Sequence, residues 1–153
     1  MTRLFPIAAD TRLFDLITGS FRRLVGRELA GPGRDADWLY HQASFVVLAH
    51  DGGDDPRFIY ANKAAQACFE YSEDELIGLP SRLSAEAPER AARQALLDRV
   101  SRDGFISDYS GIRIAKSGRR FCIENAIVWQ LIDADGQHHG QAATFSEWRN
   151  VNR

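Results

Sequence analysis

Residues 58–78 read FIYANKAAQACFEYSEDELIG, and this stretch decides the fold. Its first four residues are β-prone, and Asn62 then stands where a helix N-cap is expected, because an asparagine side chain accepts hydrogen bonds from the free backbone N–H groups of a first turn. Ser72 and Glu75 have the spacing of a capping box, and Gly78 is suited to end the short helix that follows them. The two predicted helices cover residues 63–69 and 73–77.

Strand and turn signals surround this stretch. Before it, a β-prone run at residues 45–49 ends in the turn-forming sequence DGGDDP of residues 51–56, which predicts a hairpin with the return strand at residues 57–61. After it, we expect a longer helix and then a meander of three strands separated by polar turns that contain glycine. The expected helix covers residues 88–102, and the expected strands cover residues 105–115, 120–132 and 139–148.

An apolar stripe at helical spacing precedes the hairpin. It covers residues 13–25, with Asp10 or Thr11 as its N-cap, and a second short helix is expected at residues 35–42. Several arginines on the first helix indicate a solvated face, which favours packing of the apolar stripe on the rest of the protein over its use as a dimerisation helix. The expected division is an N-terminal helical extension, residues 1–42, and a sheet-containing domain, residues 43–153.

The composition is that of an ordinary globular protein. The 153 residues suit one domain, and a hydrophobic fraction of 44% with a charged fraction of 26% is inconsistent with intrinsic disorder. The formal net charge is −2, which excludes a broad basic surface of the kind that binds nucleic acid directly. No apolar run approaches the about 20 residues that span a bilayer, so no membrane contact is expected.

The cysteines and the N-terminus favour a cytoplasmic location. Cys68 and Cys122 follow no disulfide or zinc-binding spacing, which is typical of a chain in a reducing compartment. The first ten residues carry one basic side chain and an apolar stretch broken by Pro6, which does not fit a signal peptide. The histidines lack the spacing of metal ligands, so no metal site is expected.

The order of the predicted elements, two strands, several helices and three strands, resembles that of PAS-type sensory domains. Residues 58–65 and 69–78 are similar to the local sequence patterns of that fold, and the chain as a whole resembles the compact bacterial members of the PAS-like MEKHLA family. The similarity to MEKHLA is carried by residues 79–86, 104–113, 118–121, 123–125 and 140–145. The resemblance implies an α+β fold, a PAS-like five-stranded antiparallel sheet with helices on one face and the N-terminal helical extension.

The resemblance also implies a function. We expect a sensory or signalling module that binds a small molecule in its pocket, forms a homodimer and acts on an output protein in trans. The alternative is a ligand-free protein-interaction module that serves dimerisation. An enzyme is not expected, and no catalytic residue is assigned, because the sequence contains no nucleophile elbow, phosphate-binding loop or HExxH motif.

The sequence identifies no cofactor. Gly78 and Arg82 match a flavin-binding pattern of light-sensing LOV domains, but Pro80 and Ser81 replace the asparagine and the reactive cysteine of that pattern. Because a serine hydroxyl is a far weaker nucleophile than a thiolate, adduct-forming photochemistry is disfavoured. Non-covalent flavin, with Arg82 as a phosphate contact, stays open, whereas the expected long helix has no histidine to ligate a haem.

Seven polar or aromatic residues in strongly patterned positions are the candidates for ligand binding. They are Ser81, Arg82, Tyr109, Arg113, Asn125, Trp129 and Thr144. The two arginines suit a carboxylate or phosphate on a ligand. The alternative for both is an internal salt bridge, for example with Glu86 or Glu124.

The aromatic and mid-strand candidates have alternatives too. Tyr109 and Trp129 suit one aromatic wall of a pocket, or they pack the sheet against its helices. Asn125 and Thr144 are expected within strands, where an inward polar side chain needs a hydrogen-bonding partner that a ligand or water can supply.

Overall fold

The computed structural model describes residues 7–151. The first six residues lie outside the described residues. The expectation that the N-terminus is no signal peptide rests partly on them. Among residues 7–151, none of the helices combines the length and the hydrophobicity that a membrane span requires. The elements are η1 (Ile7–Ala9), α1 (Thr11–Val25), α2 (Ala36–His41), β1 (Val46–Asp51), β2 (Phe58–Ala61), α3 (Lys63–Phe69), α4 (Glu73–Leu76), η2 (Ser81–Ser84), α5 (Ala87–Asp103), β3 (Phe105–Ile114), β4 (Arg120–Ile132), β5 (His138–Phe145) and β6 (Glu147–Asn150).

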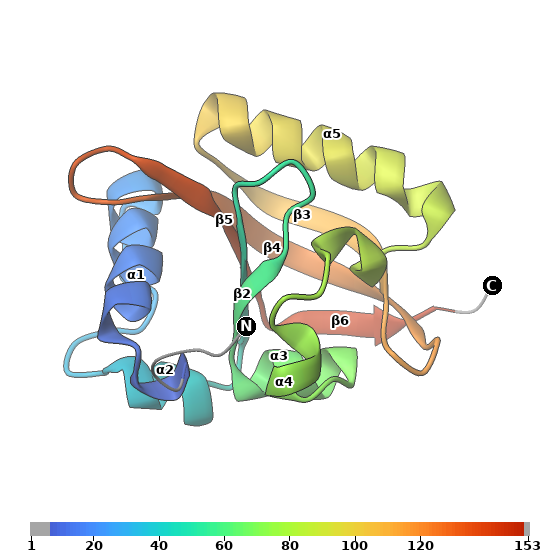
Figure 1. Cartoon of the computed structure of the whole chain (residues 1–153), viewed down its shortest axis with the longest axis horizontal. Helices are drawn as coiled ribbons and strands as arrows, with labels where there is room; N and C mark the ends of the chain where they lie inside the picture. The colour runs from blue at the N-terminus through green and yellow to red at the C-terminus, as the bar shows by residue number, and fades with distance from the viewer. Residues whose placement is uncertain (1–6, 152–153) are drawn as a thin grey trace.

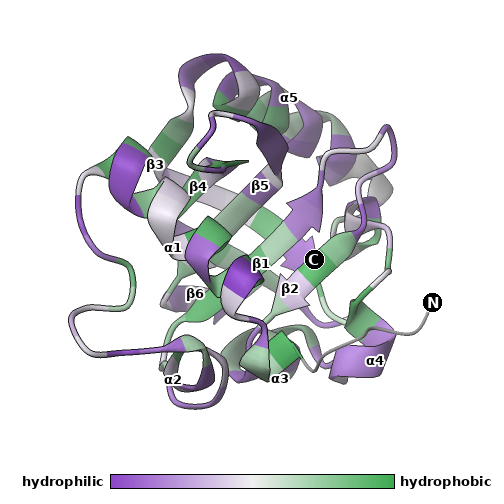
Figure 2. Ribbon diagram, turned by 60° about the vertical axis from the view of Figure 1, so that its left-hand side comes forward, coloured by the Kyte–Doolittle hydropathy of each residue, from purple (hydrophilic) through white to green (hydrophobic). Residues whose placement is uncertain are grey.

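The strands form one antiparallel sheet in the order β2-β1-β5-β4-β3, with β6 paired to β4. This order confirms the PAS-like α+β fold. Helices α3, α4 and α5 cover one face of the sheet, which we call the inner face, and α1 lies against the opposite, outer face (Figure 1). Figure 2 shows that α4 is largely hydrophilic.

Asn62 connects three segments at the start of α3. Its Oδ1 accepts hydrogen bonds from the backbone N–H groups of Ala65 at 3.0 Å and Val47 at 3.1 Å. Its Nδ2 donates to the carbonyl oxygens of Leu39 at 3.1 Å and Phe45 at 3.0 Å. The predicted helix cap is therefore confirmed. The same side chain, which is fully buried, also fixes α2 and the start of β1.

The apolar stripe of α1 packs on the outer face of the sheet. Ile17 and Phe21 are buried, and the ring of Phe21 meets that of Trp129 in a T-shaped contact with centroids 4.8 Å apart. The indole Nε1 of Trp129 donates to Ser20 Oγ at 3.2 Å. The stripe is therefore used within the protein, as the arginines of the first helix indicated.

Two bulged residues reverse the alternation of side chains along β3 and β4. Asn125 on β4 and Asp108 on β3 have φ angles of +54° and +58°, and the pairing of the two strands shifts on either side of Tyr109, which lies opposite Ala126. An extra residue in a strand turns every following side chain to the other face. As a result, Phe121 before the bulge and Ala126 after it both belong to the inner core.

The last predicted strand, residues 139–148, is divided in the structure. Strand β5 ends at Phe145, Ser146 lies between the strands, and β6 begins at Glu147. Strand β5 pairs with residues 127–132 of β4 and β6 pairs with residues 121–124. The division falls beside the bulge of β4, where Asn125 Nδ2 donates to Glu147 at 3.0 Å.

Replacing Asn62 tests its structural role. We expect Asn62→Ala to lower the free energy of unfolding by about 3 kcal/mol, because it removes a helix cap and leaves buried backbone groups without partners. Ser72→Ala, which removes the exposed cap of α4, is the matched control and should cost about 1 kcal/mol. Urea denaturation measures both values, and equal losses would contradict the role assigned to Asn62.

Candidate functional site

A small cavity lies on the inner face of the sheet, beneath α5. Its volume is about 60 Å³. It is lined by β1, β2, β3, β4 and β5 on the sheet side and by α3, η2 and α5 on the helical side. The lining includes the apolar residues Leu48, Phe58, Phe69, Leu96, Leu97, Ile123, Val128 and Phe145, and the polar residues His50, Ser84, Arg93, Tyr109, Arg113 and Gln141.

Arg93 enters this cavity from α5. It shares one face of the helix with Leu96 and Val100, and it is only 7% exposed. Its Nη2 donates to Ser81 Oγ, a side chain of η2 that is itself fully buried. Burial lowers the pKa of Arg93 to about 10, and the positive charge of Arg113 acts in the same direction. Arg93 therefore remains charged at neutral pH.

Arg113 enters the cavity from β3 and is 8% exposed. Its Nη2 donates to the hydroxyl of Tyr109 at 3.1 Å, and its Nη1 donates to the carbonyl of Ile112 at 2.9 Å. The two side chains cross over Gly111, where a Cβ would lie 2.3 Å from the Tyr109 hydroxyl and 3.0 Å from Arg113 Nη1. The absence of a side chain at position 111 is what allows this arrangement.

Neither buried arginine forms a salt bridge within residues 7–151, although the charge of Asp55 favours the charged form of Arg93. Within residues 7–151, no Asp or Glu oxygen lies within 4.0 Å of the guanidinium of Arg93 or Arg113. By contrast, the exposed Arg82 forms a salt bridge with Asp55 at 3.1 Å. A buried charge is costly unless it is paired, so two like charges facing one cavity form an unusual and specific feature.

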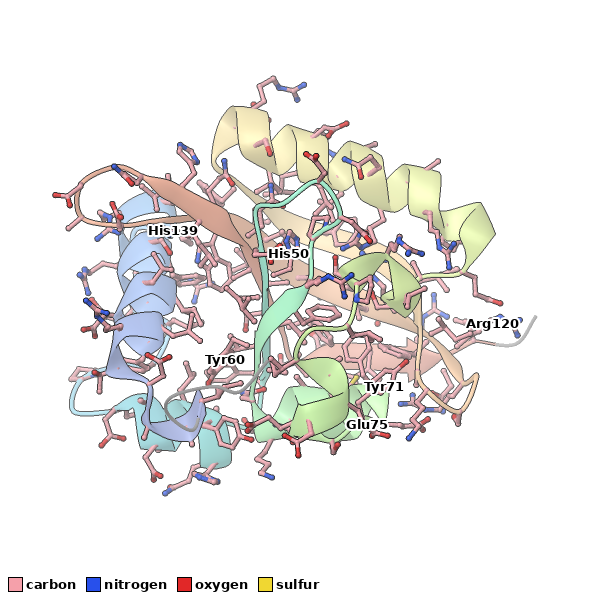
Figure 3. The ribbon with its side chains drawn as sticks, viewed as in Figure 1. His50, Tyr60, Tyr71, Glu75, Arg120 and His139 are labelled. Atoms are coloured by element: carbon pink, nitrogen blue, oxygen red, sulfur yellow. The ribbon has the colours of Figure 1, made fainter. Side chains whose placement is uncertain are left out.

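The rim of the cavity ties α5 to the sheet. Gln141 of β5 donates from Nε2 to the carbonyl of Leu97 and to Ser101 Oγ, both at 3.0 Å. The Nδ1 atom of His50, on β1, lies 2.8 Å from the carbonyl oxygen of Asp51. In Figure 3, His50 lies near α5, whereas Tyr60 points toward α1 and α2 on the outer face.

The structure brings three of the seven predicted residues together. Tyr109 and Arg113 line the cavity, and Ser81 positions Arg93 through its hydroxyl. Glu86 and Glu124, proposed above as salt-bridge partners, pair instead with Arg120 and Arg149. Of the two arginines that line the cavity, Arg113 was predicted and Arg93 was not.

The other four predicted residues lie elsewhere. Arg82 is exposed and forms a salt bridge with Asp55. A salt bridge was the alternative role given for Arg82 above, but with Glu86 or Glu124 as the example partner. Trp129 lies on the outer face against α1, so it forms no common wall with Tyr109; the bulge at Asn125 turns it away.

The side chains of Asn125 and Thr144 do not face the cavity on the inner face of the sheet. Asn125 is exposed and bonds Glu147. The Thr144 hydroxyl donates to the carbonyl of Val46 at 2.9 Å, and its side chain belongs to the outer face, opposite Ile127. Both residues line a separate, open hollow on the outer face.

Arg93 is the cavity residue that the sequence reasoning missed. A signal was present, because Arg93 precedes Leu96, Leu97 and Val100 by three, four and seven residues, the spacing of one helical face. An arginine within the apolar stripe of a helix is a candidate for a buried charge. Only its neighbours in space decide whether that charge is paired.

The site does not fit a flavin or a reactive thiol. A cavity of about 60 Å³ is well below the about 300–1,000 Å³ of pockets that hold drug-sized ligands, and Ser81 is buried and bonded to Arg93. On α3, burial raises the pKa of the Cys68 thiol to about 12, which keeps it protonated and unreactive. Across residues 7–151, no cluster of three or more His, Cys, Asp or Glu side chains is placed to hold a metal ion.

Comparisons with known proteins agree with this architecture. The model of the MEKHLA domain matches residues 11–150. The homeobox-leucine zipper protein ATHB-9 of Arabidopsis thaliana is 24% identical over 147 residues, a match that covers 92% of this chain and 17% of that protein. The chain thus spans under a fifth of the length of this curated relative.

Two solved structures show the fold. The PAS domain of a protein from Colwellia psychrerythraea superimposes with a TM-score of 0.62 at 16% identity, covering 73% of this chain and 90% of that one. The light-state dimer of the fungal blue-light photoreceptor Vivid gives a TM-score of 0.63 at 19% identity, covering 96% and 100% of the two chains. At these identities the likeness concerns the fold alone.

The half-buried His50 makes stability depend on pH. Burial lowers the pKa of His50 below its ordinary value of 6.5, and the nearby charge of Arg93 also lowers it, against the opposing effect of Asp51. Below about pH 6.5 the unfolded chain therefore takes up a proton that the folded protein resists, so the free energy of unfolding falls as the pH drops through the folded pKa.

We expect His50→Gln to remove this part of the acid sensitivity. As the pH falls from about 7 to about 5, the free energy of unfolding should decrease more for the wild type than for the variant. Urea denaturation at several pH values measures both. Parallel curves would contradict a lowered pKa. The exposed His41→Gln is the control.

Proposed function

The chain belongs to the MEKHLA domain family, and from that premise we propose that it is a PAS-like sensory module that binds a small molecule in the cavity beneath α5. One observation carries the proposal. Arg93 and Arg113, each over 90% buried, face this cavity, and neither forms a salt bridge among the described residues. Buried polar groups are usually satisfied, and a bound molecule is the simplest source of the missing interactions.

Helix α5 is the element through which binding acts. Its buried apolar contacts come from Leu96 and Val100, and polar contacts of Arg93, Leu97 and Ser101 add attachments to the sheet and η2. A helix attached by few apolar contacts shifts easily between positions. A molecule that engages Arg93 on α5 and Arg113 on β3 at once therefore changes how firmly α5 is held on the sheet.

The output is proposed to be indirect. The module acts on a partner protein in trans, as a homodimer in the cytoplasm, and has no catalytic activity of its own. The homodimer has support from the structural neighbour Vivid, whose light state is a dimer. Because the apolar stripe of α1 is buried against the sheet, the dimer contact is expected on another surface.

Native mass spectrometry of protein purified without added ligand tests the proposal. We expect a dimer with an extra mass that disappears on denaturation. Ala143→Leu, on β5, places a larger side chain in the cavity and should abolish the extra mass. Ala92→Leu, on the exposed side of α5, should retain it.

Two results would count against the sensor. An extra mass that persists in folded Ala143→Leu would place the bound molecule outside the cavity. A dimer without any retained mass, and without a change in melting temperature on addition of candidate ligands, would favour the ligand-free interaction module.

A further inference from the structure

We propose that the bound molecule is a short-chain organic carboxylate, whose carboxylate group lies between Arg93 and Arg113 and whose apolar body lies against the inner face of the sheet. The inference rests on the proposed function, because it names the ligand class of the same cavity. The cavity combines positive charge, free hydrogen-bond donors, a small volume and a largely apolar lining.

Two buried positive charges face the cavity. The guanidiniums of Arg93 and Arg113 come from different elements and face the same cavity. Burial and the charge of Arg113 disfavour the charged form of Arg93, and Asp55 and Tyr109 offset part of this effect. Arg93 keeps its proton at neutral pH, so neutralisation does not remove the cost of its buried charge. An anion between the two guanidiniums offsets both charges at once, as a buried carboxylate would in an internal salt bridge.

The donors suit a planar anion. Arg93 uses Nη2 to bind Ser81, and Arg113 uses Nη1 and Nη2 to bind Ile112 and Tyr109. Each guanidinium carries further N–H groups in a planar fork, and no other protein acceptor binds them within residues 7–151. Forks of this kind pair with the two oxygens of a carboxylate.

The rest of the cavity limits the size and character of the ligand. A volume of about 60 Å³ admits only a few non-hydrogen atoms unless the walls move. The other walls include many apolar side chains, with Leu48, Phe58 and Val128 among them. An inorganic anion would leave these walls facing a charged group, whereas a short hydrocarbon chain covers them.

Calorimetric titration and thermal unfolding with straight-chain carboxylates test the inference. The probes are acetate, butyrate, hexanoate and octanoate at constant ionic strength, with the matching primary alcohols, inorganic phosphate and chloride as comparisons. We expect the shorter carboxylates to bind and to raise the melting temperature, and we expect the alcohols, phosphate and chloride to bind much more weakly. Octanoate should bind less well than butyrate because its chain exceeds the cavity.

Substitution of the arginines locates the carboxylate. Arg93→Met and Arg113→Met keep most of the side-chain volume and should each weaken butyrate binding by about 10- to 100-fold, the effect of losing a charge-assisted hydrogen bond. Arg113→Lys keeps the charge without the planar fork and should give an intermediate loss. Arg82→Met, at an exposed arginine outside the cavity, should bind butyrate as the wild type does.

The outcomes separate this inference from the proposed function. Alcohols that bind as tightly as the acids, with binding lost in Ala143→Leu, would overturn the carboxylate while leaving a ligand-binding cavity in place. Equal binding of phosphate or chloride, or unchanged butyrate binding in a folded Arg93→Met or Arg113→Lys, would also overturn it. If no probe binds and native mass spectrometry shows no retained mass, the proposed function fails as well.

Discussion

The structure depends on one buried amide. Asn62 caps α3, and the same side chain bonds the backbone of α2 and of β1. Each of these backbone groups is buried or partly buried and would lack a partner without it, so the four hydrogen bonds hold the hairpin, α2 and α3 in one geometry. Asn62 lies between β2, which carries Phe58, and α3, which ends at Phe69, and both phenylalanines line the cavity. The geometry that Asn62 fixes therefore also positions this part of the cavity lining.

Two bulges decide which side chains reach the cavity. The extra residues at Asp108 and Asn125 allow Tyr109 and Arg113 to face inward while Trp129 faces α1. The bulged residues adopt backbone angles that are uncommon outside glycine, so surrounding contacts must hold them. The same irregularity ends the pairing of β4 with β5 and opens the edge on which β6 pairs, so the split of the last strand and the lining of the cavity have a common cause.

The arginine pair links the energetics of the fold to its function. A protein selected for stability alone gains nothing from two unpaired buried cations, and replacement of buried charges by apolar groups is often neutral or stabilising. Here the charges lie at the contact between α5, which has few apolar contacts of its own, and β3. Binding of an anion then changes the attachment of that helix, which is the physical basis of sensing in the proposal.

The sequence by itself determined the elements and their order, because caps, turns and apolar periodicity are local. The Asn62 cap, the Ser72 capping box, the hairpin and the long helix all follow from residues close together in the chain. The tertiary structure alone decided the site. A bulge reverses the face of every later side chain in its strand, so the face on which Trp129 lies depends on the bulge at Asn125. The pairing of a buried charge depends on neighbours from distant segments. For that reason Arg113 was recognised from the sequence, Arg93 was not, and only the fold shows that both face one cavity and that neither forms a salt bridge among the described residues.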